Sequence, residues 1–165
     1  MHIYIQNILR FVLLVLFQVL VLNNIQFLGY VCPYIYLLFI LSLPVQTPRW
    51  LTLILAFIIG LTVDVFSNTM GLHAFATVFM AFLRYPVIKL FVSLEENENP
   101  SPSLKTFGIA NYIKYMLLLV LIHHVVLFSM EAFNFIGFGV LMLKTLISSV
   151  VTIVLILAVQ FLKKE

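Results

Sequence analysis

The amino-acid sequence predicts an all-α membrane protein, a bundle of about six transmembrane helices that forms one integral membrane domain over residues 1–165. Two observations predict this class. Hydrophobic residues make up 64% of the chain and charged residues only 9%, whereas soluble domains carry about 25% charged residues, and the mean hydropathy is +1.18. The apolar residues also gather in runs, several of them near the roughly 20 residues that one membrane crossing requires.

The first two apolar runs are the shortest. The run over 8–22 resembles a signal peptide in charge and length, but no small-residue cleavage site follows it, so we interpret it as an uncleaved first helix. The run over 30–43 begins near Pro33 and stops at Pro44. Proline suits the first turn of a helix and cannot continue one, so we predict a short second helix between them.

Four further runs are long enough to cross a bilayer. The runs over 50–66 and 72–94 are separated by five residues, a connection so short that the two helices are expected to be antiparallel neighbours. A polar stretch over 95–105 follows, which we interpret as a solvated, mobile linker. The last two runs cover 111–133 and 140–162. The prediction is therefore six helices, with loops that alternate between the two sides of the membrane.

The basic residues indicate the orientation of the bundle. Of the nine Lys and Arg residues, all except Lys144 fall at the termini or at the second and fourth connections. The positive-inside rule makes this side cytoplasmic and places both termini there; an odd number of helices would break the pattern. Arg49, Arg84 and Lys89 are predicted to anchor this topology, with Arg84 and Lys89 snorkelling to the headgroups from the last turns of their helix.

Asp64 is the only aspartate and lies inside an apolar run. A carboxylate at a helix centre costs about 2.5–3.5 kcal/mol on insertion scales, so Asp64 is expected to face protein or water. Gly60, one turn earlier on the same face, allows close helix contact. Gly71 permits a tight backbone where the next helix begins, and His73 follows in its first turn. Asp64 is then either a structural clamp that accepts hydrogen bonds from that helix N-terminus or a functional residue.

Lys144 is the one basic residue on the other side of the membrane. It stands about one turn into the last helix, at a depth comparable with Asp64 and Glu131. We predict that Lys144 forms an ion pair with one of these two acids. The alternative is that Lys144 snorkels outward while Glu131 lies in water.

The residue inventory argues against an enzyme. A metal–phosphate or dicarboxylate site needs at least two convergent acids, and Asp64 is accompanied on its side only by Glu131. Cys32 has no second thiol, and no His-Glu-x-x-His helix is present, so neither a metal nor a cofactor is predicted. The adjacent His123 and His124 diverge by about 100° around a helix. The basic residues follow the membrane borders without forming a stripe, so no nucleic acid is expected.

The motif Gly-x-x-x-Asp-x(6)-Gly-Leu, formed here by Gly60, Asp64, Gly71 and Leu72, resembles the core of the rod shape-determining protein MreD family. The resemblance extends over the whole hydrophobic plan of the chain. The basic end of the fourth helix, at Arg84, also fits. The short second run departs from that plan.

This resemblance implies a non-enzymatic scaffold in the bacterial inner membrane that serves cell elongation and peptidoglycan synthesis. Its expected partners are an MreC-like single-span protein, a RodA-like glycosyltransferase with its transpeptidase, cytoplasmic MreB filaments and the lipid bilayer. The family's bundle is also similar to the substrate-binding S-components of energy-coupling factor transporters. The alternative function is therefore a small-molecule-binding membrane component of a transporter.

Overall fold

The structure, a computed structural model, describes residues 2–24, 31–93, 99–132 and 137–162. Within these ranges the chain is helical: α1 (His2–Leu20), a 3-10 turn (Leu22–Asn24), α2 (Leu37–Leu41), α3 (Arg49–Ser67), α4 (Leu72–Phe91), α5 (Ile109–Glu131) and α6 (Phe138–Leu162). Five of these helices are long and apolar enough to cross a membrane. The chain is thus an all-α, multi-pass membrane protein.

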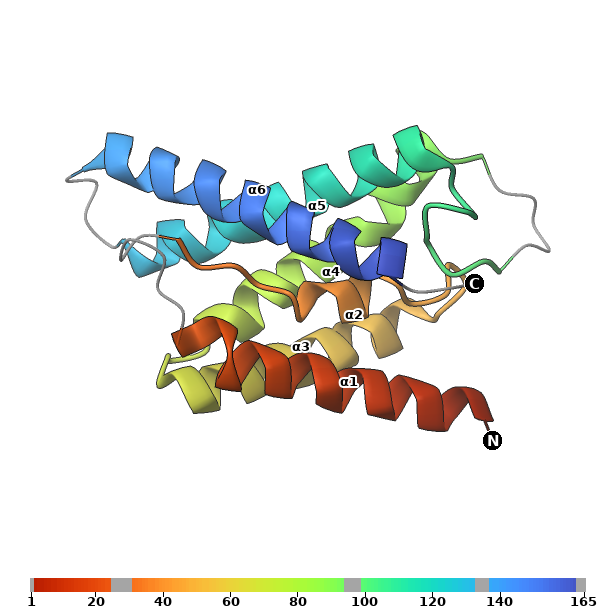
Figure 1. The fold of residues 1–165 in the computed structure, drawn as a ribbon, viewed down its shortest axis with the longest axis horizontal. Coiled ribbons are helices and arrows are strands. Elements are labelled where there is room, and N and C mark those ends of the chain that lie inside the picture. The colour runs from red at the N-terminus through yellow and green to blue at the C-terminus, as the bar shows by residue number, and fades with distance from the viewer. Residues whose placement is uncertain (1, 25–30, 94–98, 133–136, 163–165) are drawn as a thin grey trace.

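The long helices lie side by side (Figure 1): α1 and α3 run in the same direction, and α3, α4, α5 and α6 alternate in direction. α4 packs between α3 and α5, α6 packs on α5, and α1 packs on α3. The start of α1 and the end of α6 lie at one end of the bundle, which we call the terminal end; the connection between α3 and α4 lies at the opposite end, the turn end (Figure 1). The most deeply buried large side chains come from α2 and its flanks and from α3, α4 and α5, so the core surrounds α2.

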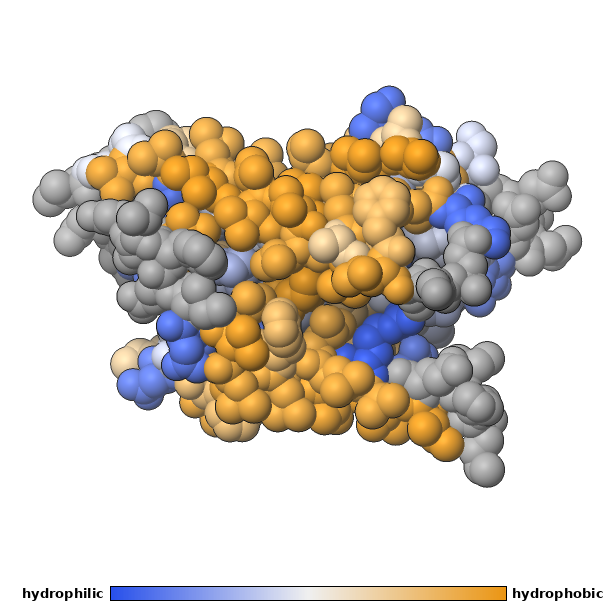
Figure 2. Space-filling view, viewed as in Figure 1, coloured by the Kyte–Doolittle hydropathy of each residue, from blue (hydrophilic) through white to orange (hydrophobic). Residues whose placement is uncertain are grey.

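Large apolar side chains cover the outside of the bundle. Figure 2 shows them as a continuous belt over α1 and α6, with hydrophilic residues gathered at the two ends. On α1 and α6 the exposed residues include Leu13, Phe17, Leu146 and Val150. A soluble monomer rarely exposes so large an apolar patch, and the belt has the distribution expected of a surface that faces lipid.

The prediction of a second helix over 30–43 is wrong for most of its length. Only Leu37–Leu41 is helical, and the residues from 31 to 36 form no helix; residue 30 lies outside the described residues. The segment still crosses the bundle alongside α1, because Ile35 bonds Gln18 and Ser42 bonds Arg10. Together with the five long helices it gives a sixth crossing, so both chain ends described lie at the terminal end (Figure 1).

A non-helical crossing is tolerated at membrane depth only where protein satisfies its backbone polar groups. Side chains of α1 and α6 do so here. The bonds are Cys32 N–H to Ser148 Oγ (3.1 Å), Tyr34 N–H to Thr152 Oγ1 (3.0 Å), Ile35 N–H to Gln18 Oε1 (2.9 Å) and Gln18 Nε2–H to Pro33 O (3.0 Å). Gln18 thus serves one donor and one acceptor of the same extended segment.

Arg84 holds the carboxyl end of α2 in place. Its Nη2 donates to the carbonyl of Leu43, and its Nε donates to the hydroxyl of Tyr115 at 3.2 Å. Tyr115 in turn donates to the carbonyl of Leu41 at 2.9 Å. Arg84 thus bonds a carbonyl two residues past the end of α2 directly, and the last carbonyl of α2 through Tyr115. The predicted snorkelling of Arg84 to the headgroups is therefore wrong: the side chain is 3% exposed and points to α2.

The polar stretch over 95–105 is described only from residue 99 onward. Asn99 accepts a bond from Gln46 N–H at 2.8 Å through its side-chain oxygen, and the carbonyl of Pro100 accepts one from Val45 N–H at 3.1 Å. This part of the predicted mobile linker is consequently fastened to the connection between α2 and α3.

Candidate functional site

Asp64 lies near the turn end of α3 and is 1% exposed. Its Oδ1 accepts hydrogen bonds from the backbone N–H of His73 at 3.0 Å and from the hydroxyl of Thr69, and its Oδ2 accepts one from the N–H of Ala74 at 2.8 Å. These N–H groups belong to the first turn of α4, where they have no partner inside the helix. Asp64 therefore clamps the end of α3 to the start of α4, in the way the clamp alternative predicted.

Gly60 lets the two helices come close enough for this clamp. A Cβ atom built on Gly60 would lie 2.5 Å from the Cα of Ala74 and 2.8 Å from the carbonyl oxygen of His73, far inside van der Waals contact. Gly71 precedes α4 with φ +81°, a left-handed conformation that glycine adopts without strain. The two glycines thus bring the α4 N-terminus against Asp64.

A buried tyrosine–histidine cluster, formed by Tyr36, His73, Thr77 and His123, lies next to the clamp. The hydroxyl of Tyr36 is 3.2 Å from His73 Nδ1, 3.2 Å from Thr77 Oγ1 and 2.9 Å from His123 Nε2. The Thr77 hydroxyl donates to the carbonyl of His73 at 2.6 Å. One hydroxyl therefore ties the segment before α2 to both α4 and α5.

The available protons indicate which groups of the tyrosine–histidine cluster donate and which accept. Since the Thr77 hydroxyl donates its proton to the His73 carbonyl, it can only accept a hydrogen bond from Tyr36. If Tyr36 gives its single proton to Thr77, then His73 Nδ1–H and His123 Nε2–H both donate to the Tyr36 oxygen, and both imidazoles stay neutral. His123 Nδ1, which has no hydrogen-bond partner among the described residues, is then an unpaired acceptor. This arrangement needs no charge inside the bundle.

His124 belongs to a separate set of bonds. Its Nδ1 lies 2.8 Å from the carbonyl of Val120, and its Nε2 lies 3.2 Å from the hydroxyl of Thr152. The carbonyl fixes the proton on Nδ1, so Nε2 accepts from Thr152. His123 and His124 thus bind different partners, and among the described residues no group of three or more His, Cys, Asp or Glu side chains is placed to hold a metal ion.

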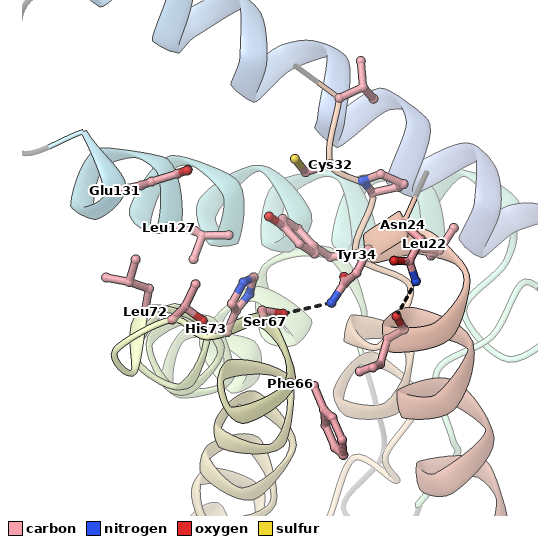
Figure 3. A pocket seen from close by; sticks show the side chains of 15 residues that line it. Leu22, Asn24, Cys32, Tyr34, Phe66, Ser67, Leu72, His73, Leu127 and Glu131 are labelled. Carbon is pink, nitrogen blue, oxygen red and sulfur yellow. Dashed lines mark hydrogen bonds between the residues drawn. The ribbon is translucent and has the colours of Figure 1, made fainter. Parts of the chain in front are cut away.

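A cavity of about 410 Å³ opens at the turn end beside the tyrosine–histidine cluster. Figure 3 shows Tyr34, His73, Ser67 and Cys32 around it, with Glu131 on the end of α5. Part of its polar lining is already bonded within the protein, because Asn23 Nδ2 donates to Ser67 Oγ at 2.9 Å. The cavity is therefore partly polar, and its only charged lining side chain among the described residues is a carboxylate.

The acid that pairs with Lys144 is Glu131. Lys144 Nζ lies 2.8 Å from Glu131 Oε2, and the two side chains are 21% and 52% exposed. Lys144 Nζ also lies 4.3 Å from the centre of the Phe128 ring. The alternative pairing of Lys144 with Asp64 is wrong, because both oxygens of Asp64 are already bonded to Thr69 and the α4 backbone.

Replacing Lys144 with methionine is expected to lower the free energy of unfolding by about 1 kcal/mol or less, because an exposed ion pair contributes that little. Thermal unfolding in one detergent, compared for K144M, E131Q and the double variant, measures the pair. A coupling free energy between the two substitutions of zero to about 1 kcal/mol agrees with the structure. A loss of several kcal/mol would mean that the pair is shielded from water.

Of the remaining predicted site residues, Arg49 and Lys89 are exposed at the terminal end. Both lie over the ring of Tyr85, with the Arg49 guanidinium carbon at 4.5 Å and Lys89 Nζ at 4.7 Å from the ring centre. Their positions are those expected of topology anchors. Sequence reasoning missed Tyr36 and Thr77; the spacing of His73 and Thr77 by one helical turn was the available signal, since it puts both on one face of α4.

Replacing Tyr36 with phenylalanine is expected to destabilise the protein by about 1–3 kcal/mol, because three buried groups lose their shared hydroxyl. The matched control is Tyr85→Phe, which removes the same atom from a half-buried ring whose described contacts are to the face of the ring. Thermal unfolding of the two variants should differ clearly. Equal melting temperatures would show that the tyrosine–histidine cluster contributes nothing to stability.

Comparison with known proteins gives no relative for this chain: no family model, no curated protein and no solved structure matches it.

Proposed function

We propose that the protein is a non-enzymatic, MreD-like subunit of the bacterial cell-elongation machinery, embedded in the inner membrane. It scaffolds an MreC-like protein and a RodA-like glycosyltransferase with its transpeptidase, in register with MreB filaments. The observation that supports the proposal is that the residues of the MreD-like motif form one structural unit. Gly60, Asp64 and Gly71, which carry the resemblance to the MreD family, together build the α3–α4 clamp.

The clamp favours a scaffold over a catalyst or a carrier that works through Asp64. A catalytic or ion-coupling carboxylate needs an accessible oxygen, and both oxygens of Asp64 accept bonds from the protein while the residue is 1% exposed. The histidines next to it are likewise bonded to neighbours in the bundle. What the bundle offers to partners is then its surface, which is an apolar belt with polar ends (Figure 2).

In this proposal the terminal end faces the cytoplasm. Arg49, Lys89, Lys105 and Lys114 belong to the segments that meet at that end, while Glu131 and Lys144 lie at the turn end. The positive-inside rule supports this orientation. The turn end, with its cavity, then faces the periplasm, where the main part of an MreC-like partner would lie.

The test is purification of the tagged protein from its native membrane into nanodiscs, followed by mass spectrometry of the retained proteins. A tagged, unrelated multi-pass protein from the same membrane is the control. Enrichment of MreC-like and RodA-like proteins, together with loss of rod shape on depletion, is the expected result. Recovery of neither above the control, in cells that keep their shape on depletion, would overturn the proposal.

A small-molecule-binding component of a transporter is the second candidate, because of the cavity at the turn end. Its volume of about 410 Å³ falls within the 300–1,000 Å³ typical of ligand pockets. Tyr34, His73 and Ser67 offer hydrogen-bonding groups to its interior (Figure 3). Co-purification of a coupling ATPase, or of one tightly held small molecule released on denaturation, would favour this function over the scaffold.

A further inference from the structure

A second cleft, of about 340 Å³, lies between the first turn of α3 and the last turns of α4, at the terminal end. Three cationic side chains line it, those of Arg49, Arg84 and Lys89, and no acidic residue does among the described residues. Thr47 and Thr52 also line it, with their hydroxyls donating to the carbonyls of Pro44 and Pro48. Such a concentration of positive charge around one hollow suits an anion.

Arg84 gives the cleft an unmatched charge. Its bonds to Leu43 and Tyr115 engage Nε and Nη2 with neutral acceptors, and its Nη1 donates to none of the described residues. The side chain is nevertheless 3% exposed. A cation buried without a counter-charge is costly, and an anion within reach would offset part of that cost.

The start of α3 adds further positive potential. The helix follows Pro48, and none of the described side chains caps it, so the first N–H groups of this 19-residue helix remain available at the cleft. Arg49 on α3 and Lys89 on α4 each place their cation over the ring of Tyr85, so two like charges gather around one side chain of the cleft lining. An anion bound at the cleft would offset their mutual repulsion.

The surroundings of the cleft indicate the depth at which it sits. Trp50, Phe82 and Leu90 beside it are 64%, 65% and 69% exposed. Tryptophan and basic residues together are typical of the level of the lipid headgroups, where the apolar belt ends. Positive-inside charge alone would explain exposed Arg49 and Lys89, but it does not require the buried guanidinium of Arg84 in the same cleft.

We propose that this cleft binds the phosphate group of an anionic phospholipid. Arg49 and Lys89 contact the phosphate from the two helices, Arg84 neutralises it from beneath through Nη1, and the acyl chains lie on the adjoining apolar surface of Phe82 and Leu90. Basic pockets between transmembrane helices recognise headgroups through this chemistry. The inference stands independently of the scaffold function.

The experiment is native mass spectrometry of the full-length protein, first delipidated and then titrated with phosphatidylglycerol, with phosphatidylcholine as the neutral comparison. The test variant is R49Q/K89Q. The control is K105Q/K114Q, which removes the same charge from exposed positions at the same end of the bundle. Arg84 is left intact because it holds α2, and thermal unfolding confirms that both variants fold.

The unmodified protein should prefer phosphatidylglycerol, and R49Q/K89Q should bind it about tenfold more weakly or worse, because each basic residue near anionic lipid contributes a several-fold gain. The control should lose clearly less affinity, because Lys105 and Lys114 do not line the cleft. Equal losses in both variants would reveal unspecific attraction to the basic end and overturn the site. Binding of inorganic phosphate alone as tightly as the lipid would overturn the phospholipid assignment in favour of a soluble anion.

Discussion

Replacing Gly60 with alanine is expected to destabilise the protein by about 1–3 kcal/mol, the usual cost of overpacking a close contact. The added methyl would lie 2.5 Å from the Cα and 2.8 Å from the N of Ala74. Both are backbone atoms, so no side chain can rotate away, and α3 and α4 must separate. Separation stretches the bonds from Asp64 to the α4 N-terminus. Detergent thermal unfolding, followed by the amount of monodisperse protein that survives heating, measures the loss.

Gly139→Ala is the matched control, because a Cβ on Gly139 meets no atom of the described residues within 4 Å. Gly139 lies in the first turn of α6, where alanine gains less than the roughly 0.5–1 kcal/mol of a helix interior, so this variant should be about as stable as the parent. The two identical substitutions are thus expected to differ, with a loss of stability only for G60A. If G60A proved as stable as G139A, the close approach of α3 and α4 at Gly60 would not exist in the membrane.

The parts of the fold that depend on residues close together in the sequence could be predicted. Runs of about 20 apolar residues indicate membrane helices without further information, and a five-residue connection makes α3 and α4 antiparallel. The clamp was predictable for the same reason. A single tight turn separates Asp64 from the N–H groups of His73 and Ala74, which lack partners inside the helix. A lone carboxylate just before a helix N-terminus is therefore enough to predict these hydrogen bonds.

The crossing over residues 31–43 could not be predicted, because apolar composition does not distinguish a membrane helix from a buried extended segment. What permits the extended form is a set of donors and acceptors supplied from far along the chain. Ser148 and Thr152 reach Cys32 and Tyr34 over sequence separations of 116 and 118 residues. A single sequence shows these hydroxyls inside α6 but not which backbone they serve.

The error at Arg84 follows from the error in α2. A basic residue near the end of a membrane helix ordinarily snorkels to the headgroups. Here the short helix α2 ends at Leu41, and the chain just past it presents the carbonyl of the buried Leu43 to the guanidinium. If the second crossing is assumed to be a continuous helix, its carbonyls are bonded within the helix and none is left in the interior to accept a hydrogen bond from Arg84. The pairing of Lys144 was left open for a related reason, since depth alone could not choose between two acids.

Replacing Asp64 with leucine is expected to have the largest effect, because two backbone N–H groups and the Thr69 hydroxyl lose their acceptor. Each buried donor left unpaired costs about 1–3 kcal/mol. The backbone pair alone therefore removes about 2–6 kcal/mol, against a total stability of about 5–15 kcal/mol for typical domains. Little folded protein should be recovered by size-exclusion chromatography in mild detergent. Parent protein prepared in parallel sets the reference yield.

Asp64→Asn separates the hydrogen bonds from the charge and should be milder than Asp64→Leu. Its carbonyl oxygen can replace Oδ1, which accepts from His73 and Thr69, while its NH₂ group takes the place of Oδ2 and faces the N–H of Ala74, a donor against a donor. One bond of three is lost, so an intermediate melting temperature is expected. If Asn proved as harmful as Leu at equal expression, the negative charge itself would be essential, and the clamp would not be the main task of Asp64.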